Sequence, residues 1–269
     1  MTPSPAAAAD GKVAGALIAL AERLADTSGA VIRRYFRSGV AVIDKADTSP
    51  VTIADREAEA EIRRLILAAH PDHGIIGEEH GIERADAEWV WVLDPIDGTK
   101  SFITGRPLFG TLIALCRHGT PVMGVIDHPA LGERWIGAHG HATTMNGKPV
   151  RTRACADLHH AALFASSPHQ FHGSAFDAFE AVRRKARLVQ YGSDCYHYAL
   201  VASGYGDVAI EAGLGIYDYL AVVPVVEGAG GIVTDWAGQP VGLGSGEKVL
   251  AAGDARVHAE ALALLRGSA

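Results

Sequence analysis

Apolar residues recur at helical spacing in the first part of the chain. An amphipathic helix that continues to about Arg37 is predicted by the positions of Leu17, Leu20, Leu24, Val31, Ile32 and Tyr35. An extended segment at Val40–Asp44 and a mobile loop at 45–50 are expected to follow. Thr52 can then cap a second helix, which would run through about Ala69.

After the second predicted helix the apolar residues occur in shorter runs, which are separated by residue pairs typical of turns. Pairs such as His118-Gly119 and Asn146-Gly147 are typical of tight turns between strands. The predicted strands are Gly74–Gly77, Trp89–Leu93, Phe109–Cys116, Val122–Ile126 and Glu133–Gly137. Because no helix-length pattern interrupts them, the first half predicts two helices packed on an antiparallel sheet.

The pattern changes to alternating strands and helices after about residue 153. Strands are predicted at Ala161–Ala165, Leu188–Gln190, Val208–Glu211, Gly231–Thr234 and Val249–Ala252. Helices are predicted near 173–186, 195–204, 218–229 and 254–266. The sequence therefore predicts an α+β domain at 1–152, followed by an α/β domain at 153–269.

Composition and charge narrow the class of protein. The 269 residues are 48% hydrophobic and 20% charged, as in globular proteins. A net charge of −7 gives no electrostatic reason to expect nucleic acid as a partner.

The cysteines Cys116, Cys155 and Cys195 are too widely spaced for a Cys-x-x-Cys metal site, and we expect reduced thiols in the cytoplasm. No membrane partner is expected, because the apolar stretch Val13–Leu20 is too short to span a bilayer.

Two carboxylates follow the predicted strand Trp89–Leu93. Asp94 and Asp97 flank Pro95-Ile96, and the proline ring stiffens the turn by fixing φ. Carboxylates three positions apart on such a turn can face one point in space, as can the carbonyl of Ile96. The segment therefore offers several oxygen atoms to a single ligand.

The residues after this turn suit a phosphate group. Gly98 allows the backbone to approach a ligand closely. Residues 98–103 can begin a short helix whose N–H groups would bind phosphate, with Thr99 adding a hydroxyl donor.

Further carboxylates occur at Glu78-Glu79, after a predicted strand, and at Asp218, where a predicted helix begins. Oxygen ligands without histidine or thiolate are those that Mg²⁺ prefers. Two such ions about 3.5–4 Å apart can activate water and stabilise the leaving oxygen of a phosphate ester. The sequence thus favours a magnesium-dependent phosphatase that acts on a small phosphate ester.

Taken singly, Asp-Pro, Asp-Gly and Glu-Glu pairs are common in turns and on surfaces. Together they belong to a segment, Asp94–Phe102, that no turn requires. An upstream Gly-Glu-Glu at 77–79 and a downstream Asp218 before Glu227–Gly231 accompany it. With these motifs the chain resembles the inositol monophosphatase family across nearly its whole length.

The resemblance implies an activity, a fold and a set of site residues. Family members are Mg²⁺-dependent phosphatases with a layered αβαβα sandwich fold, and they are commonly homodimers. The implied metal ligands are the carboxylates of Glu78, Asp94, Asp97 and Asp218 and the carbonyl of Ile96. Gly98 and Thr99 match the N–H groups that bind phosphate, and the nucleophilic water would be oriented by Thr99, Glu78 and Asp55.

Segments outside the core motif are similar to the histidinol-phosphate phosphatase branch of the family. They are Lys100–Gly105, Phe109–Leu115, Tyr191–Tyr196, Tyr217–Ala221 and Pro224–Gly231. This similarity implies hydrolysis of L-histidinol phosphate to L-histidinol in histidine biosynthesis. Because that substrate carries an ammonium and an imidazole, its pocket should offer carboxylates away from the metals. Asp194 and Glu211 are the candidates.

The same residues are compatible with other roles and activities. Asp194 can instead be the N-cap of the helix that follows it. The enzyme can be an inositol monophosphatase or another sugar-phosphate or nucleotide-phosphate phosphatase on the same scaffold. A regulatory binding protein that has kept the fold is a third possibility, although such a protein has no need of a complete set of acidic ligands.

Overall fold

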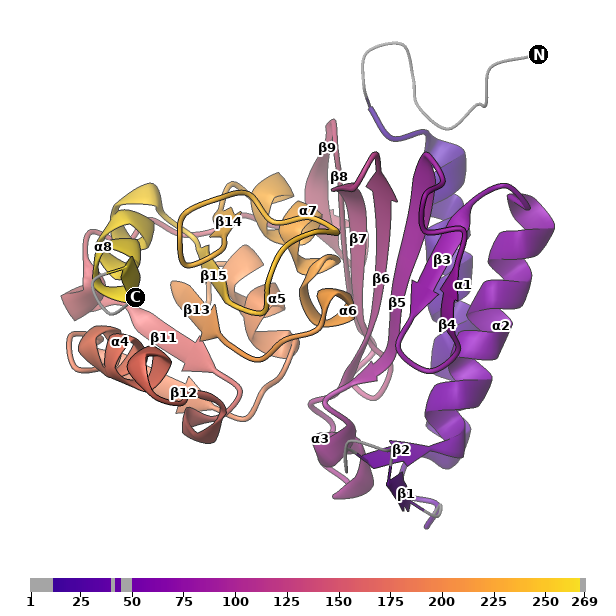
Figure 1. The fold of residues 1–269 in the computed structure, drawn as a ribbon, viewed down its shortest axis with the longest axis horizontal. Coiled ribbons are helices and arrows are strands. Elements are labelled where there is room, and N and C mark those ends of the chain that lie inside the picture. Colours follow the sequence, from indigo (N-terminus) through magenta and orange to yellow (C-terminus); the bar gives the residue numbers. More distant parts are fainter. Residues whose placement is uncertain (1–11, 40–41, 45–49, 267–269) are drawn as a thin grey trace.

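The computed structural model describes residues 12–39, 42–44 and 50–266, and Figure 1 shows its layers. Two long helices lie on one side of an eight-stranded sheet, and further helices separate that sheet from a five-stranded one. Two more helices cover the far face of the smaller sheet. The αβαβα sandwich implied by the resemblance is therefore confirmed.

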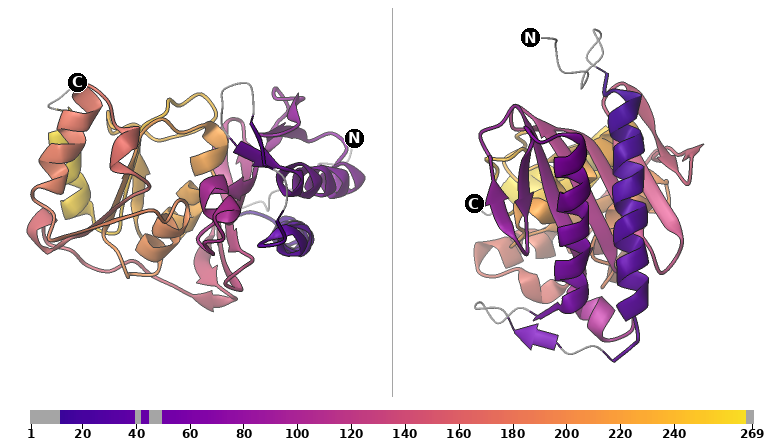
Figure 2. Two further views of the ribbon diagram at one scale, coloured as in Figure 1. Left: turned by 90° about the horizontal axis from the view of Figure 1, so that it is seen from below. Right: turned by 90° about the vertical axis from the view of Figure 1, so that its right-hand side faces the viewer.

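The outermost layer consists of α1 (Gly15–Tyr35) and α2 (Ile53–Ala69), which lie side by side on the large sheet (Figure 2). The predicted cap of α2 is confirmed, since Ala54 N donates to Thr52 Oγ1 at 3.1 Å. The Asp55 carboxylate in turn accepts from Thr52 N at 2.8 Å. This reciprocal capping box fixes where α2 begins and holds Asp55 in its first turn.

A short antiparallel pair precedes α2, formed by β1 (Val42–Asp44) and β2 (Pro50–Thr52). The extended segment predicted here is confirmed over Val42–Asp44. Its first two residues, 40–41, and most of the predicted loop, 45–49, lie outside the described residues.

The large sheet has the strand order β10-β9-β8-β7-β6-β5-β3-β4. Its strands are β3 (Gly74–Gly77), β4 (Gly81–Glu83), β5 (Trp89–Asp97), β6 (Gly110–Arg117), β7 (Thr120–His128), β8 (Glu133–Ala138), β9 (His141–Met145) and β10 (Lys148–Pro149). Each strand predicted in the first half is present. The sequence pattern missed β4, β9 and β10, which are short and carry exposed residues.

One pairing in this sheet differs from the prediction. The sheet is antiparallel except at β3 and β5, which pair parallel with Gly74 opposite Val90 and Gly77 opposite Leu93. The expectation of a purely antiparallel sheet is wrong here because β4 forms a hairpin with β3 first. The chain therefore reverses twice before β5, which brings the ends of β3 and β5 to the same edge.

The middle layer contains α5 (Tyr196–Ala202), α6 (Ile216–Tyr219) and α7 (Val222–Gly228). The sequence predicted one helix over 218–229, but the structure has two. Pro224 explains the division, because it has no N–H to donate to the carbonyl of Leu220 four residues earlier.

The smaller sheet has the order β12-β11-β13-β15-β14. Its strands are β11 (Ala162–Ala165), β12 (Leu188–Tyr191), β13 (Val208–Glu211), β14 (Ile232–Thr234) and β15 (Val249–Ala252). Strand β11 is parallel to β12 and β13, whereas β15 is antiparallel to both of its neighbours. Helices α4 (Ser174–Arg183) and α8 (Ala255–Arg266) cover the outer face of this sheet. The connections between its elements include the 3-10 turns η1 (Leu158–His160) and η2 (Pro168–Gln170).

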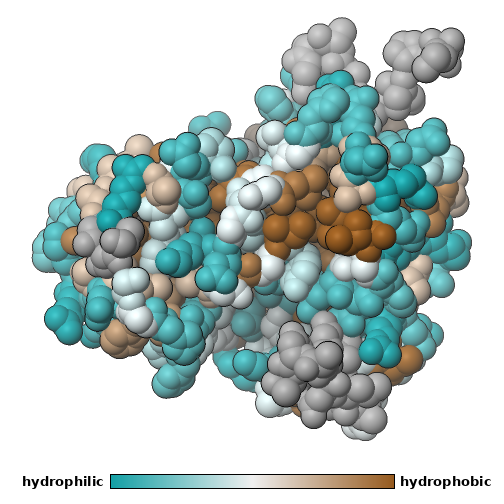
Figure 3. Space-filling model, viewed as in Figure 1, coloured by the Kyte–Doolittle hydropathy of each residue, from teal (hydrophilic) through white to brown (hydrophobic). Residues whose placement is uncertain are grey.

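A buried apolar cluster joins the two halves of the chain. It includes Val92 and Leu112 of the large sheet together with Val222 and Val226 of α7. In Figure 3 polar side chains cover most of one face, and an apolar patch lies near its middle, where the halves meet. The division into domains at 1–152 and 153–269 stays a prediction, and both parts contribute to this shared core.

Among the described residues, no helix has both the length and the apolar character that crossing a bilayer would require.

Candidate active site

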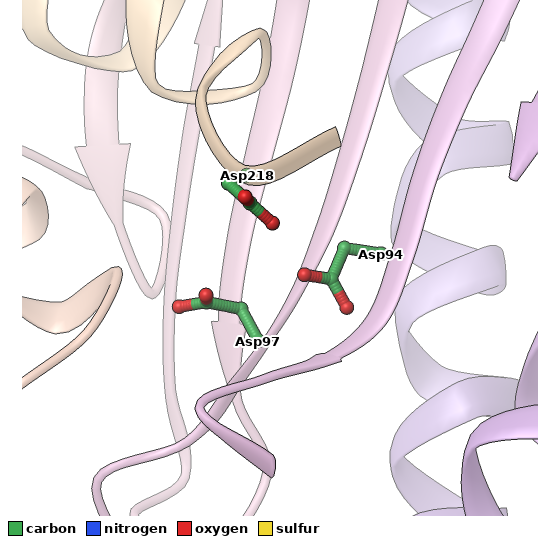
Figure 4. Close-up of side chains that lie close together, drawn as sticks. All are labelled: Asp94, Asp97 and Asp218. Atoms are coloured by element: carbon green, nitrogen blue, oxygen red, sulfur yellow. The ribbon is translucent and has the colours of Figure 1, made fainter. Parts of the chain in front are cut away.

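Three aspartates converge where the large sheet meets the middle layer. Asp94 and Asp97 come from the end of β5 and Asp218 from α6, and their carboxylates face one another in Figure 4. One carboxylate oxygen from each lies within 4.8 Å of the others, a grouping that could hold a metal ion. The structure thus brings together three of the predicted metal ligands.

Local hydrogen bonds fix the direction of each carboxylate. Ile96 N donates to Asp94 Oδ1 at 3.0 Å, across an irregularity in the pairing of β5 with β6. Cys195 N donates to Asp97 Oδ2 at 2.6 Å. Gly215 N donates to Asp218 Oδ2 at 2.7 Å, which makes Asp218 part of the cap of α6. Each side chain is oriented before any ligand binds.

The electrostatics of the cluster suit a cation. Burial and the charges of Glu78 and Asp97 raise the pKa of Asp94 well above its usual range. Burial and the charges of Asp194 and Asp218 do the same to the pKa of Asp97. The charges that act most strongly on Asp94 are all carboxylates, so a divalent cation would relieve repulsion that the protein itself leaves in place.

Glu78 and Asp55 lie beside this cluster. Glu78 follows β3, with its N–H donating to Leu93 O of the parallel strand at 3.2 Å, and it lines the same pocket as Asp97 and Asp218. Asp55 is buried at the start of α2, where burial is the main cause of its raised pKa, and the charge of Glu78 adds to it. The capping box thus presents Asp55 to the acidic cluster.

The turn after β5 leads into α3 (Thr99–Ile103), as predicted. Its N-cap, Gly98, has φ of 82°, and a Cβ there would lie 2.7 Å from Asp194 Oδ2. Both the left-handed backbone and the close approach of Asp194 therefore require glycine. Thr99 Oγ1 donates to Ile96 O at 3.1 Å, which ties α3 to the end of β5.

Asp194 does not cap the following helix. The N-cap position of α5 is Cys195, and no side chain bonds there. The Asp194 carboxylate instead accepts from Ser101 Oγ of α3 at 2.9 Å. The helix-cap interpretation is wrong because the Asp194 carboxylate bonds Ser101 and no N–H of α5, and Asp194 itself has a left-handed φ of 44°.

A pocket of about 510 Å³ extends from the acidic cluster. Its lining includes Glu78, Asp97, Gly98, Thr99, Asp194, Glu211 and Asp218, and also Lys100, Ser101, Arg106, Ser166, Ser167 and Gln170. Sequence reasoning gave no role to the last six. Ser166 and Ser167 directly follow β11, and the same position at a strand end had drawn attention to Glu78 and Asp94.

Glu211 lies in the wall of this pocket and is almost completely buried. It accepts a hydrogen bond from Ser166 N, and its Oε1 lies 3.5 Å from His197 Nε2. Burial lowers the pKa of His197 to about 3, so the imidazole is neutral and cannot supply a counter-charge. Burial accordingly raises the pKa of Glu211 to about 8.

This shift predicts a pH dependence of stability. Between its ordinary pKa and about 8, Glu211 keeps its proton when folded and loses it when unfolded, so the wild type becomes less stable as the pH rises. Glu211→Gln should remove that loss and exceed wild-type stability by a few kcal/mol at pH 8, with the gap closing toward pH 5. Metal-free urea unfolding at both pH values measures it. If the stability of the two proteins depended on pH in the same way, the raised pKa of Glu211 would be wrong. The same gain in stability from Glu247→Gln, a control at an exposed position, would also contradict it.

The chain is similar to known phosphatases. The chain is 51% identical over 253 residues to the bifunctional phosphatase IMPL2, chloroplastic, of Arabidopsis thaliana, covering 91% of this chain and 73% of that protein. It is 40% identical to a histidinol-phosphatase of Chlorobaculum parvum, covering 82% of this chain and 86% of the other.

A solved inositol monophosphatase from Zymomonas mobilis superposes with a TM-score of 0.87 at 45% identity, covering 94% of this chain and 98% of that one. Residues 15–268 match the inositol monophosphatase family. Since that match spans both sheets and every residue of the acidic cluster, the chain belongs to the inositol monophosphatase family.

Proposed function

We propose that this phosphatase hydrolyses L-histidinol phosphate in a Mg²⁺-dependent reaction. The proposed metal ligands are the carboxylates of Glu78, Asp94, Asp97 and Asp218 and the carbonyl of Ile96. They fit Mg²⁺ because every donor is an oxygen and the repulsion within the cluster favours a cation. When bound, the metal would lower the pKa of a water molecule and stabilise charge on the leaving oxygen.

The remaining proposed roles belong to side chains and backbone near the cluster. Gly98 and Thr99 line the pocket at the start of α3, where their N–H groups would bind the phosphate oxygens. Thr99 Oγ1 donates its proton to Ile96 O, so its oxygen remains free to accept a hydrogen bond from the attacking water. Glu78 and Asp55 would help to orient that water from the other side of the cluster.

One observation carries the choice of substrate: the pocket contains two carboxylates, Asp194 and Glu211, in addition to its metal cluster. An uncharged polyol could donate hydroxyl hydrogen bonds to them, but it has no positive charge to pair with either carboxylate. Histidinol carries an ammonium, which either carboxylate could pair with, and an imidazole. The bound ammonium would also favour loss of the proton that Glu211 holds in the free protein.

The proposal predicts a change in substrate preference. Asp194→Asn should lower kcat/KM for histidinol phosphate by roughly ten- to a hundredfold, because a charge-assisted hydrogen bond contributes about 1.5–3 kcal/mol. Hydrolysis of inositol 1-phosphate should change far less. Asparagine tolerates the positive φ and can still accept from Ser101, so the melting temperature should stay near that of the wild type.

The ratio of kcat/KM for the two substrates is the decisive measurement. Asp194 contributes to the raised pKa of Asp97, so its replacement can alter metal binding, but this alters both substrates alike and cancels in the ratio. Asp177→Asn, at an exposed position on α4, is the matched control and should leave the ratio unchanged. An unchanged ratio in Asp194→Asn would remove the argument for histidinol phosphate.

A further inference from the structure

A buried carboxylate outside the pocket contacts the backbone that carries Glu78. Glu59 has no exposed surface and lies on α2, one helical turn after Asp55. Its Oε2 accepts from Glu79 N at 2.8 Å, and its Oε1 accepts from His80 N at 3.1 Å. Both N–H groups belong to the turn between β3 and β4, directly after Glu78.

Arg63, one turn further along α2, completes this arrangement. Its Nε donates to Glu59 Oε1 at 2.7 Å, which neutralises the buried charge. Its other nitrogens donate to Gly81 O and to Glu83 Oε1, so the same arginine also contacts β4. Helix α2 is therefore joined to the turn and to β4 by four hydrogen bonds from two side chains.

The packing leaves no freedom at this contact. A Cβ on Gly77 would lie 1.9 Å from Glu59 Oε1 and 2.8 Å from Arg63 Nη2. The backbone before Glu78 thus presses against the Glu59 carboxylate, while the backbone after it is hydrogen-bonded to the same group. Only glycine allows this approach at position 77.

We propose that Glu59 is a positioning residue that holds the β3–β4 turn and so sets the place of the Glu78 carboxylate relative to Asp55. Asp55 and Glu59 lie on the same face of α2. The helix therefore holds the Asp55 carboxylate directly, and it holds the Glu78 carboxylate through Glu59 and the turn. Glu59 does not line the pocket and contacts no substrate. The inference rests on the proposed function only in treating Glu78 as a metal ligand.

Glu59→Gln tests this with two readouts. Glutamine keeps one acceptor oxygen but points an NH₂ group at the other N–H, so exchange of the Glu79 and His80 amides in metal-free protein should speed up by about tenfold or more. Mg²⁺ affinity, measured by calorimetric titration, should fall by about ten- to a hundredfold. At saturating Mg²⁺, kcat should recover to within a few-fold of wild type and KM should be unchanged.

The controls separate this proposal from a general loss of structure. Glu61→Gln, an exposed carboxylate on the same helix that bonds Arg64, should change neither readout. If Glu59→Gln does not fold, Glu59→Gln/Arg63→Gln removes both buried charges together and should give the same two changes.

Two results would overturn the proposal. The first is that Glu59→Gln leaves amide exchange at Glu79 and His80 unchanged. The second is that Glu59→Gln speeds this exchange but keeps wild-type Mg²⁺ affinity, although Glu78→Gln weakens Mg²⁺ binding. If Glu78→Gln itself leaves Mg²⁺ affinity unchanged, the proposed function fails at that ligand and the metal part of this inference fails with it. The exchange rates identify which of the two is at fault.

Discussion

Asp94→Asn is expected to lower kcat by about two to three orders of magnitude. The substitution keeps the size of the side chain and its acceptance of Ile96 N, but it removes a charge from the centre of the acidic cluster. Without that charge the remaining carboxylates would hold a divalent cation weakly and out of place. Phosphate release at saturating substrate and Mg²⁺ measures the effect.

The fold should survive this change. Burial and neighbouring carboxylates raise the pKa of Asp94, so its ionised form costs stability at neutral pH, and metal-free Asp94→Asn should melt at or above the wild-type temperature. Asp127→Asn is the matched control: it removes another buried carboxylate, on β7 and outside the pocket, and should leave kcat near the wild-type value. Near-normal turnover in Asp94→Asn would show that the catalytic centre lies elsewhere.

Removal of divalent cations by excess chelator should abolish phosphatase activity. All proposed ligands are oxygen atoms, and Mg²⁺ added in excess should restore the full rate. Ca²⁺ should bind without restoring it, because its looser and larger coordination does not hold water and phosphate oxygens in the geometry that Mg²⁺ imposes. Initial rates across a series of free metal concentrations test this directly.

A second measurement makes this prediction independent of turnover. Metal binding to the folded state should raise the melting temperature of the wild type with increasing Mg²⁺, and much less so in Asp94→Asn. Activity that persists in chelator, or an equal rise of the melting temperature in both proteins, would refute a metal site at the cluster.

Much of the candidate site follows from short stretches of sequence. Asp94 and Asp97 lie three positions apart at the end of one strand, so the strand by itself already brings their carboxylates close together. Thr52 and Asp55 likewise form a capping box through contacts only three residues apart. Local geometry of this kind depends on backbone preferences that the residue types themselves set, and the sequence could therefore predict it.

The sequence was weakest where an element is short or exposed. The strands β4, β9 and β10 have few buried residues, so no apolar alternation identifies them. The break between α6 and α7 was missed because the apolar pattern runs through it, although Pro224 was a signal that could have found it.

Sequence alone thus determined the order of most helices and strands, the position of the acidic motif and the resemblance that implies its chemistry. Tertiary structure alone decided that β3 lies parallel to β5, that Asp194 bonds Ser101 at a separation of 93 residues, and that Glu59 holds the turn after Glu78. Local periodicity reports which face of an element is buried, but it carries no information on which distant element buries it. That choice depends on how the layers pack together, and the packing brings Asp218 of α6 to the end of β5.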